Sequence, residues 1–164
     1  MVLVEFALVL PVLMILLLGM FSGANAWNQK QAISHGARVA ARFASTLPIP
    51  DDHPGREAWL DDIADRAVGA AEGAMAADVA GRALCVAYVD PAGTAPDETV
   101  SRRTDEAGVV TTHADACFDD GQGDDAQRVQ VVLERDGILD IGFRRQHLDL
   151  RGESVYRYEV VSGI

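Results

Sequence analysis

A run of apolar residues near the start of the chain constrains the fold more than any other feature. From Phe6 to Ala24 only Pro11, two glycines and one serine interrupt it. Its length is therefore close to the roughly 20 apolar residues that cross the hydrocarbon core of a bilayer as a helix. No Lys or Arg precedes the run, unlike in a secretory signal peptide. We interpret it as a retained transmembrane helix rather than a buried core helix, because the polar-rich remainder is too short to wrap so long an apolar rod.

The helix is expected to continue beyond the membrane, because no proline follows before Pro48. Residues 1–26 are predicted to form its transmembrane half and residues 27–46 an amphipathic half with a face of small residues. Trp27 is predicted to anchor the helix at the membrane interface, with Lys30 one turn further on. A helix over residues 3–46 would be about 65 Å long and would project well beyond the bilayer.

Two features of the apolar run predict contacts with other helices. Glu5 is a carboxylate among apolar neighbours, so it needs a partner such as the terminal amine at Met1, or else a place at the solvated headgroup level. Gly19 and Gly23 have the GxxxG spacing that lets two helices approach closely, although incidental glycines are an equally good explanation.

Three strings in this region resemble one family. VEFALVLP at Val4–Pro11, WNQKQA at Trp27–Ala32 and GARVAAR at Gly36–Arg42 occur in that order. Together they resemble the TadE-like minor pseudopilins of tight-adherence (Tad) pili, which belong to the type IV pilin superfamily. The resemblance covers about the first 45 residues and includes no motif of the remaining chain.

The resemblance implies a function in assembly. In that superfamily a prepilin peptidase removes a short basic leader after a glycine, which leaves glutamate at the fifth position of the mature chain, where Glu5 stands. Glu5 would then neutralise the terminal amine of an adjacent subunit, and Met1, Phe6 and Pro11 would belong to the same assembly segment. The implied partners are other pilin and pseudopilin subunits, the bacterial cytoplasmic membrane and the pilus assembly machinery. The C-terminal domain would lie on the outer side of the cytoplasmic membrane, and the assembled subunit would lie in an extracellular pilus.

Charge separates the two parts of the chain. Residues 1–50 contain three basic residues and Glu5, so of the total charge of −11 about −13 falls on residues 51–164. Such an excess disfavours nucleic acid and anionic lipid as partners of the distal domain, because phosphate binding requires clustered Lys and Arg.

The remaining chain, residues 47–164, is predicted to be an acidic extracytoplasmic α+β domain. Alternating apolar positions predict a helix over 55–78, and β-forming residues predict strands over 83–89, 129–133 and 155–160. Residues 138–143 fit a short strand or a loop, and the polar stretch of about 90–126 fits an extended loop or a loose hairpin. The expected fold is a long N-terminal membrane-spanning helix, a second helix and a small antiparallel sheet packed on the distal half of the first helix.

The two cysteines, Cys85 and Cys117, allow one intramolecular disulfide. Outside the cytoplasm a bond between them is favoured over two reduced buried thiols. It would pin the long polar segment onto the sheet.

Sites for chemistry are sparse. The stretch DDGQGDD places four carboxylates around two glycines, and hard cations such as calcium prefer oxygen ligands; its carboxylates are Asp119, Asp120, Asp124 and Asp125. It lacks the spacing of an EF-hand, so a solvated acidic loop is the better interpretation.

No nucleophile elbow, P-loop or dinucleotide motif occurs, so we predict a protein without a cofactor that is not an enzyme. A membrane-anchored binding module, an adhesin or sensor whose acidic loop holds calcium, is the alternative function.

Overall fold

The computed structural model describes residues 2–50, 53–93, 99–140 and 144–158, and it has the α+β fold that the sequence predicts. Two helices precede five strands. The elements are α1 (Val2–Ala44), α2 (His53–Ala70), β1 (Ala83–Val89), β2 (Thr99–Thr104), β3 (Val110–His113), β4 (Arg128–Asp140) and β5 (Arg145–Arg157).

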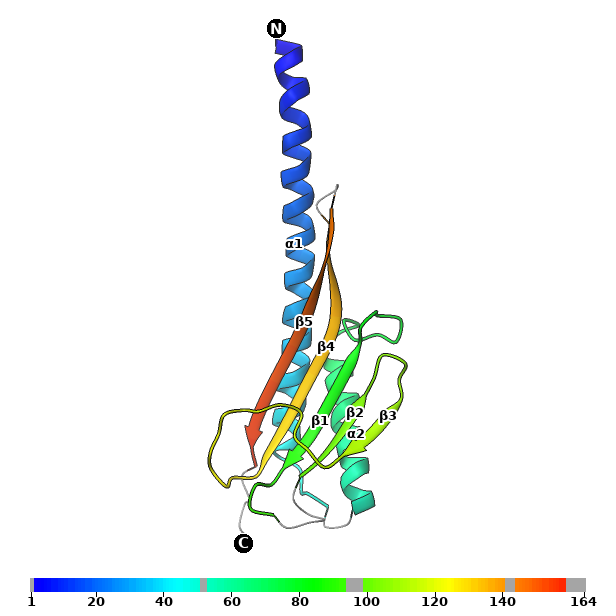
Figure 1. Ribbon diagram of the computed structural model, residues 1–164, viewed down its shortest axis with the longest axis vertical. Helices are drawn as coiled ribbons and strands as arrows, with labels where there is room; N and C mark the ends of the chain where they lie inside the picture. Colours follow the sequence, from blue (N-terminus) through cyan, green and yellow to red (C-terminus); the bar gives the residue numbers. More distant parts are fainter. Residues whose placement is uncertain (1, 51–52, 94–98, 141–143, 159–164) are drawn as a thin grey trace.

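The long helix α1 runs without interruption through Pro11 and projects far beyond the rest of the molecule (Figure 1). Only its second half packs on the domain. The buried side chains on that half are mostly alanines, which lets the helix lie close to the sheet; they are Ala26, Ile33, Ala37, Ala40, Ala41 and Ala44. Packing is equally close against α2, because a β-carbon on Gly36 would come within 2.6 Å of the carbonyl oxygen of Ala67.

The five strands form one antiparallel sheet in the order β3-β2-β1-β4-β5. Helix α1 packs on β4 and β5, and α2 packs mainly on β1, so that the two helices cover one face of the sheet. Alternate residues of the strands point toward the helices, as the period of two along a strand requires. The core between the two layers includes Ile33, Leu60, Ile63, Met75 and Leu133, all fully buried.

Helix α2 is shorter than the predicted 55–78 and ends at Ala70. Residues 71–75 form turns, with Glu72 at φ 48° and Gly73 at φ 79°. Left-handed residues end a helix because they turn the chain out of the helical path. Ala74 and Met75, expected on the apolar stripe of that helix, are nevertheless buried.

The strands also differ from their predicted ranges. The strand expected at 129–133 is the start of the longer β4, which includes 138–140; residues 141–143 lie outside the described part. The strand expected at 155–160 is the end of β5, whose first ten residues the sequence did not predict, and residues 159 and 160 also lie outside it. Within the polar stretch β2 and β3 pair as a hairpin, and residues 114–127 cross the sheet as a loop.

Candidate functional site

The first half of α1, up to Phe21, is covered by no other part of the described structure. Every large apolar side chain between Val4 and Phe21 is exposed, with exposed fractions from 40% at Ile15 to 77% at Phe21. The mean hydropathy of this segment reaches 2.5, and none of it is buried. Exposed apolar surface of this extent requires lipid or another protein surface to cover it. The segment has the length and composition of a membrane-spanning helix.

Glu5 lies in the first turn of this exposed segment, and its side chain faces outward next to Phe6, which is 64% exposed. The dipole of α1 favours a carboxylate at this end of the helix. Met1, the other member of the expected ion pair, lies outside the described residues.

Pro11, Gly19 and Gly23 lie along the same exposed half. A β-carbon on Gly23 would meet no atom within 4 Å, so its backbone is open at the surface of the helix. The two glycines of the GxxxG pair lie one turn apart on α1.

The boundary between the exposed and packed halves of α1 falls at residues 26–30. Ala26 is the first buried residue, while Trp27 is 67% exposed. The amine of Lys30 donates a hydrogen bond to the carbonyl oxygen of Arg151 on β5. Lys30, which the sequence assigned to the membrane interface, therefore also joins the helix to the sheet.

One contact in the apolar half was not predicted from the sequence. The backbone amide of Asp140, at the end of β4, donates a hydrogen bond of 2.7 Å to Oγ of Ser22. The only sequence feature that pointed to this contact was a serine within an apolar run, and a serine alone does not indicate which residue it contacts.

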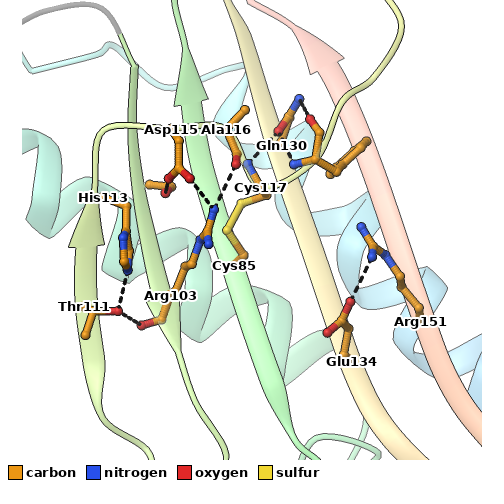
Figure 2. Close-up of a disulfide and its surroundings, with 12 residues drawn as sticks. Cys85, Arg103, Thr111, His113, Asp115, Ala116, Cys117, Gln130, Glu134 and Arg151 are labelled. Carbon is orange, nitrogen blue, oxygen red and sulfur yellow. Dashed lines mark hydrogen bonds and ion pairs between the residues drawn. A yellow bond between two sulfur atoms is a disulfide. The ribbon is translucent and has the colours of Figure 1, made fainter.

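The outer face of the sheet, away from the helices, carries the disulfide. Cys85 of β1 is bonded to Cys117, with their Cα atoms 5.8 Å apart. Residues 114–127, here called the covering loop, are thereby held over this face (Figure 2). The bond and its effect on the polar segment agree with the interpretation of the sequence.

Gln130 of β4 holds the covering loop in a way that the sequence did not reveal. Its side chain is buried, at 1% exposure. Its Oε1 accepts hydrogen bonds of 3.0 and 3.3 Å from the amides of Cys117 and Phe118. Its Nε2 donates bonds of 3.1 and 3.0 Å to the Phe118 carbonyl and to Asp120 (Figure 2 draws the surroundings). All four hydrogen-bonding positions of this amide are thus occupied.

Two of the four candidate calcium ligands are engaged by arginines. Asp120 forms an ion pair of 3.4 Å with Arg128, whose side chain is 5% exposed. Asp124 accepts a hydrogen bond of 3.1 Å from the same guanidinium and also pairs with Arg157. These carboxylates therefore attach the covering loop to β4 and β5. Within the described ranges, no group of three or more His, Cys, Asp or Glu side chains is placed to hold a metal ion.

A cavity of about 360 Å³ lies on the outer face beside the disulfide, and Arg103 and Arg151 contribute to its wall. Both guanidinium groups are engaged by carboxylates, with Asp115 at 3.0 Å from Arg103 and Glu134 at 3.2 Å from Arg151 (Figure 2). Each of the two arginines in the wall thus has a carboxylate partner.

Comparison with known proteins gives one match. Residues 1–42 match the sequence model of the family described as TadE-like protein. No curated protein and no solved structure is significantly similar to the chain. The match covers the exposed half of α1 and most of the half that packs on the sheet. Residues 1–42 are therefore similar to the TadE-like family, as the sequence predicted, and the match does not extend to residues 43–164.

Proposed function

We propose that this chain is a minor pilin-like subunit of a Tad-type pilus or of the complex that initiates or caps it. TadE-like proteins are structural components of pili, so the match at residues 1–42 supports this class of function over catalysis. The observation that carries the proposal is the uncovered apolar half of α1, which lies within the matched segment.

In this proposal residues 1–26 span the cytoplasmic membrane before assembly, and residues 27–46 join them to an external domain at residues 47–164. A helix with so much exposed apolar surface is stable in lipid or among similar helices, and in water it aggregates. Extraction from the membrane therefore requires that other pilin and pseudopilin subunits receive it. A removed leader would involve prepilin peptidase as a further partner.

Glu5 has a specific part in this assembly. Its carboxylate is exposed on the apolar helix, so a packed bundle of such helices would bury it. A buried carboxylate is tolerated only beside a cation, and the amine of a neighbouring subunit at Met1 is the partner proposed. The pair would fix the axial position of one subunit against the next, because any other register leaves the charge unpaired.

The test is co-purification of the full chain with the other pilus subunits after expression in a cell that makes the pilus. Glu5→Ala should abolish co-purification while the chain stays in the membrane fraction. Asp78→Ala, which removes an exposed carboxylate of the distal domain, is the matched control and should leave co-purification unchanged. Retention of all partners by Glu5→Ala would refute the role of Glu5 in assembly. A chain released from membranes by alkaline extraction would refute insertion itself.

A further inference from the structure

The hairpin formed by β4 and β5 extends along α1 toward its N-terminus, beyond the rest of the sheet (Figure 1). Its end is attached to the helix at a defined height by the hydrogen bond from the Asp140 amide to Ser22. About two turns further toward the C-terminus of α1, the Lys30 amine donates a hydrogen bond to the carbonyl oxygen of Arg151. The described residues at the end of the hairpin, 138–140 and 144–147, are therefore held beside the apolar half of α1.

The height of this contact can be placed against a bilayer. Ser22 lies two residues before the end of the apolar run at Ala24, which corresponds to about 3 Å along the helix. The polar layer on each side of the hydrocarbon core is roughly 5–8 Å thick. If residues 1–26 span the membrane as proposed, the Asp140 amide lies at the inner edge of that polar layer. Trp27, an exposed residue of the type that gathers at membrane interfaces, lies one to two turns further out.

The side chains at the end of the hairpin suit such a layer. Ile138 is 54% exposed although it belongs to a strand. Arg144 and Arg145 are also exposed, and Arg145 is paired with Asp140 at 2.9 Å. Residues 138–140 and 144–147 thus carry one net positive charge, in a region of the chain that carries about −13. This end of the domain is the part whose charge suits an anionic surface.

We propose that the end of the β4–β5 hairpin is a second membrane contact of this protein. Ile138 enters the interface of the bilayer that holds α1, and Arg144 binds the phosphate of an anionic phospholipid headgroup. Arg145 remains with Asp140. The contact fixes the rotation of α1 and its packed domain relative to the bilayer, and it holds the acidic remainder of the domain away from the lipid. The proposal depends on membrane insertion of α1 but not on assembly of a pilus.

The test uses the full chain in vesicles of phosphatidylcholine with phosphatidylglycerol. An environment-sensitive fluorophore is attached at Ile138→Cys, at Leu13→Cys in the apolar half of α1, or at Val110→Cys on the distant strand β3. The native cysteines are bonded to each other, so they do not compete for the label. Lipids with bromine on the acyl chain quench a label in the bilayer, and aqueous iodide quenches a label in water.

Labels at Leu13→Cys and Ile138→Cys should be quenched by the brominated lipid, and the label at Val110→Cys by iodide. If position 138 behaves like position 110 while position 13 is quenched by lipid, insertion of α1 stands and the hairpin contact is wrong. If position 13 is not quenched by lipid, the proposed insertion itself is wrong. Shielding of position 138 from both quenchers would mean that a second protein surface covers the hairpin, which also overturns the lipid contact.

The headgroup contact has its own test. In the labelled Ile138→Cys chain, Arg144→Gln should shift the equilibrium from the inserted to the withdrawn hairpin by about fivefold. The shift should vanish in vesicles of phosphatidylcholine alone, which have no net charge. The matched control is Arg38→Gln, an exposed arginine on α1 about 20 Å beyond the end of the apolar run. Equal effects of Arg144→Gln and Arg38→Gln would refute binding of the headgroup by Arg144.

Discussion

Gly152 of β5 lies directly against the backbone of Ile33 in α1. A β-carbon at position 152 would come within 2.8 Å of the Ile33 carbonyl carbon and of the next amide nitrogen, distances at which one of the two backbones must move. The absence of a side chain at this one position lets the helix lie flat on the long hairpin.

Gly152→Ala should therefore destabilise the domain by about 1–3 kcal/mol, the usual effect of overpacking. Urea unfolding of the full chain in detergent, followed by circular dichroism, measures the change. Gly23→Ala is the matched control, because its β-carbon would meet nothing within 4 Å and alanine favours the helix. The close approach would be disproved by equal unfolding midpoints for Gly152→Ala and the unaltered chain.

Reduction of the bond between Cys85 and Cys117 should lower the free energy of unfolding by about 3–4 kcal/mol. The two residues are 32 apart in sequence, and loop-closure entropy in the unfolded chain sets the magnitude. Urea midpoints with and without dithiothreitol measure the effect, and thiol titration verifies reduction. The Cys85→Ser, Cys117→Ser double variant should match the reduced protein and no longer respond to dithiothreitol. An unchanged midpoint after full reduction would contradict the prediction.

Gln130→Ala should loosen the covering loop, because it leaves the half-buried amides of Cys117 and Phe118 without their acceptor. The expected loss of stability is about 1–3 kcal/mol. Hydrogen exchange gives the sharper measurement, since these two amides should exchange faster while those of β1 keep their protection. Gln146→Ala, at an exposed position on β5, serves as the control. Unchanged protection at both amides would show that the Gln130 side chain does not hold the loop.

The alkaline stability of the fold should depend on Tyr88. Burial of this side chain, together with the carboxylate of Asp90 beside its hydroxyl, raises the pKa of Tyr88 above its ordinary value. The folded state therefore keeps a proton that the unfolded chain loses at about pH 10. The stability that comes from the protonated Tyr88 is fully present below about pH 10. Above about pH 10 the free energy of unfolding falls by up to about 1.4 kcal/mol per pH unit.

Tyr88→Phe cannot ionise, so it should lose less stability than the unaltered chain between about pH 9 and about pH 11. Urea unfolding at the two pH values gives the comparison. Tyr156→Phe removes the hydroxyl from a tyrosine that is 37% exposed and should behave like the unaltered chain. Parallel losses in Tyr88→Phe and the unaltered chain would contradict the assignment.

The sequence predicted the elements whose signals are local. Hydropathy located the long helix, β-forming residues located the strand at 83–89, and the single cysteine pair allowed only one bond within the chain. These signals depend on neighbouring residues, so they can be read without the fold.

The features that sequence reasoning missed depend on partners far along the chain. The first residues of β5 are polar and become a strand because β4 pairs with them. Gly152, Gln130 and Ser22 gain their roles only when α1, the hairpin and the covering loop are brought together. The early end of α2 was also missed, because no neighbouring residue indicates that Glu72 adopts a left-handed backbone conformation.

The direction of the β4–β5 hairpin has a mechanical consequence. Both strands run lengthwise beside α1 (Figure 1). Their contacts with Ser22, Lys30 and Ile33 follow one another along the helix. Tension applied along the helix axis is thus shared by all of these attachments in shear, instead of breaking them one after another by peeling. A domain attached in this way resists being torn from a helix under axial traction.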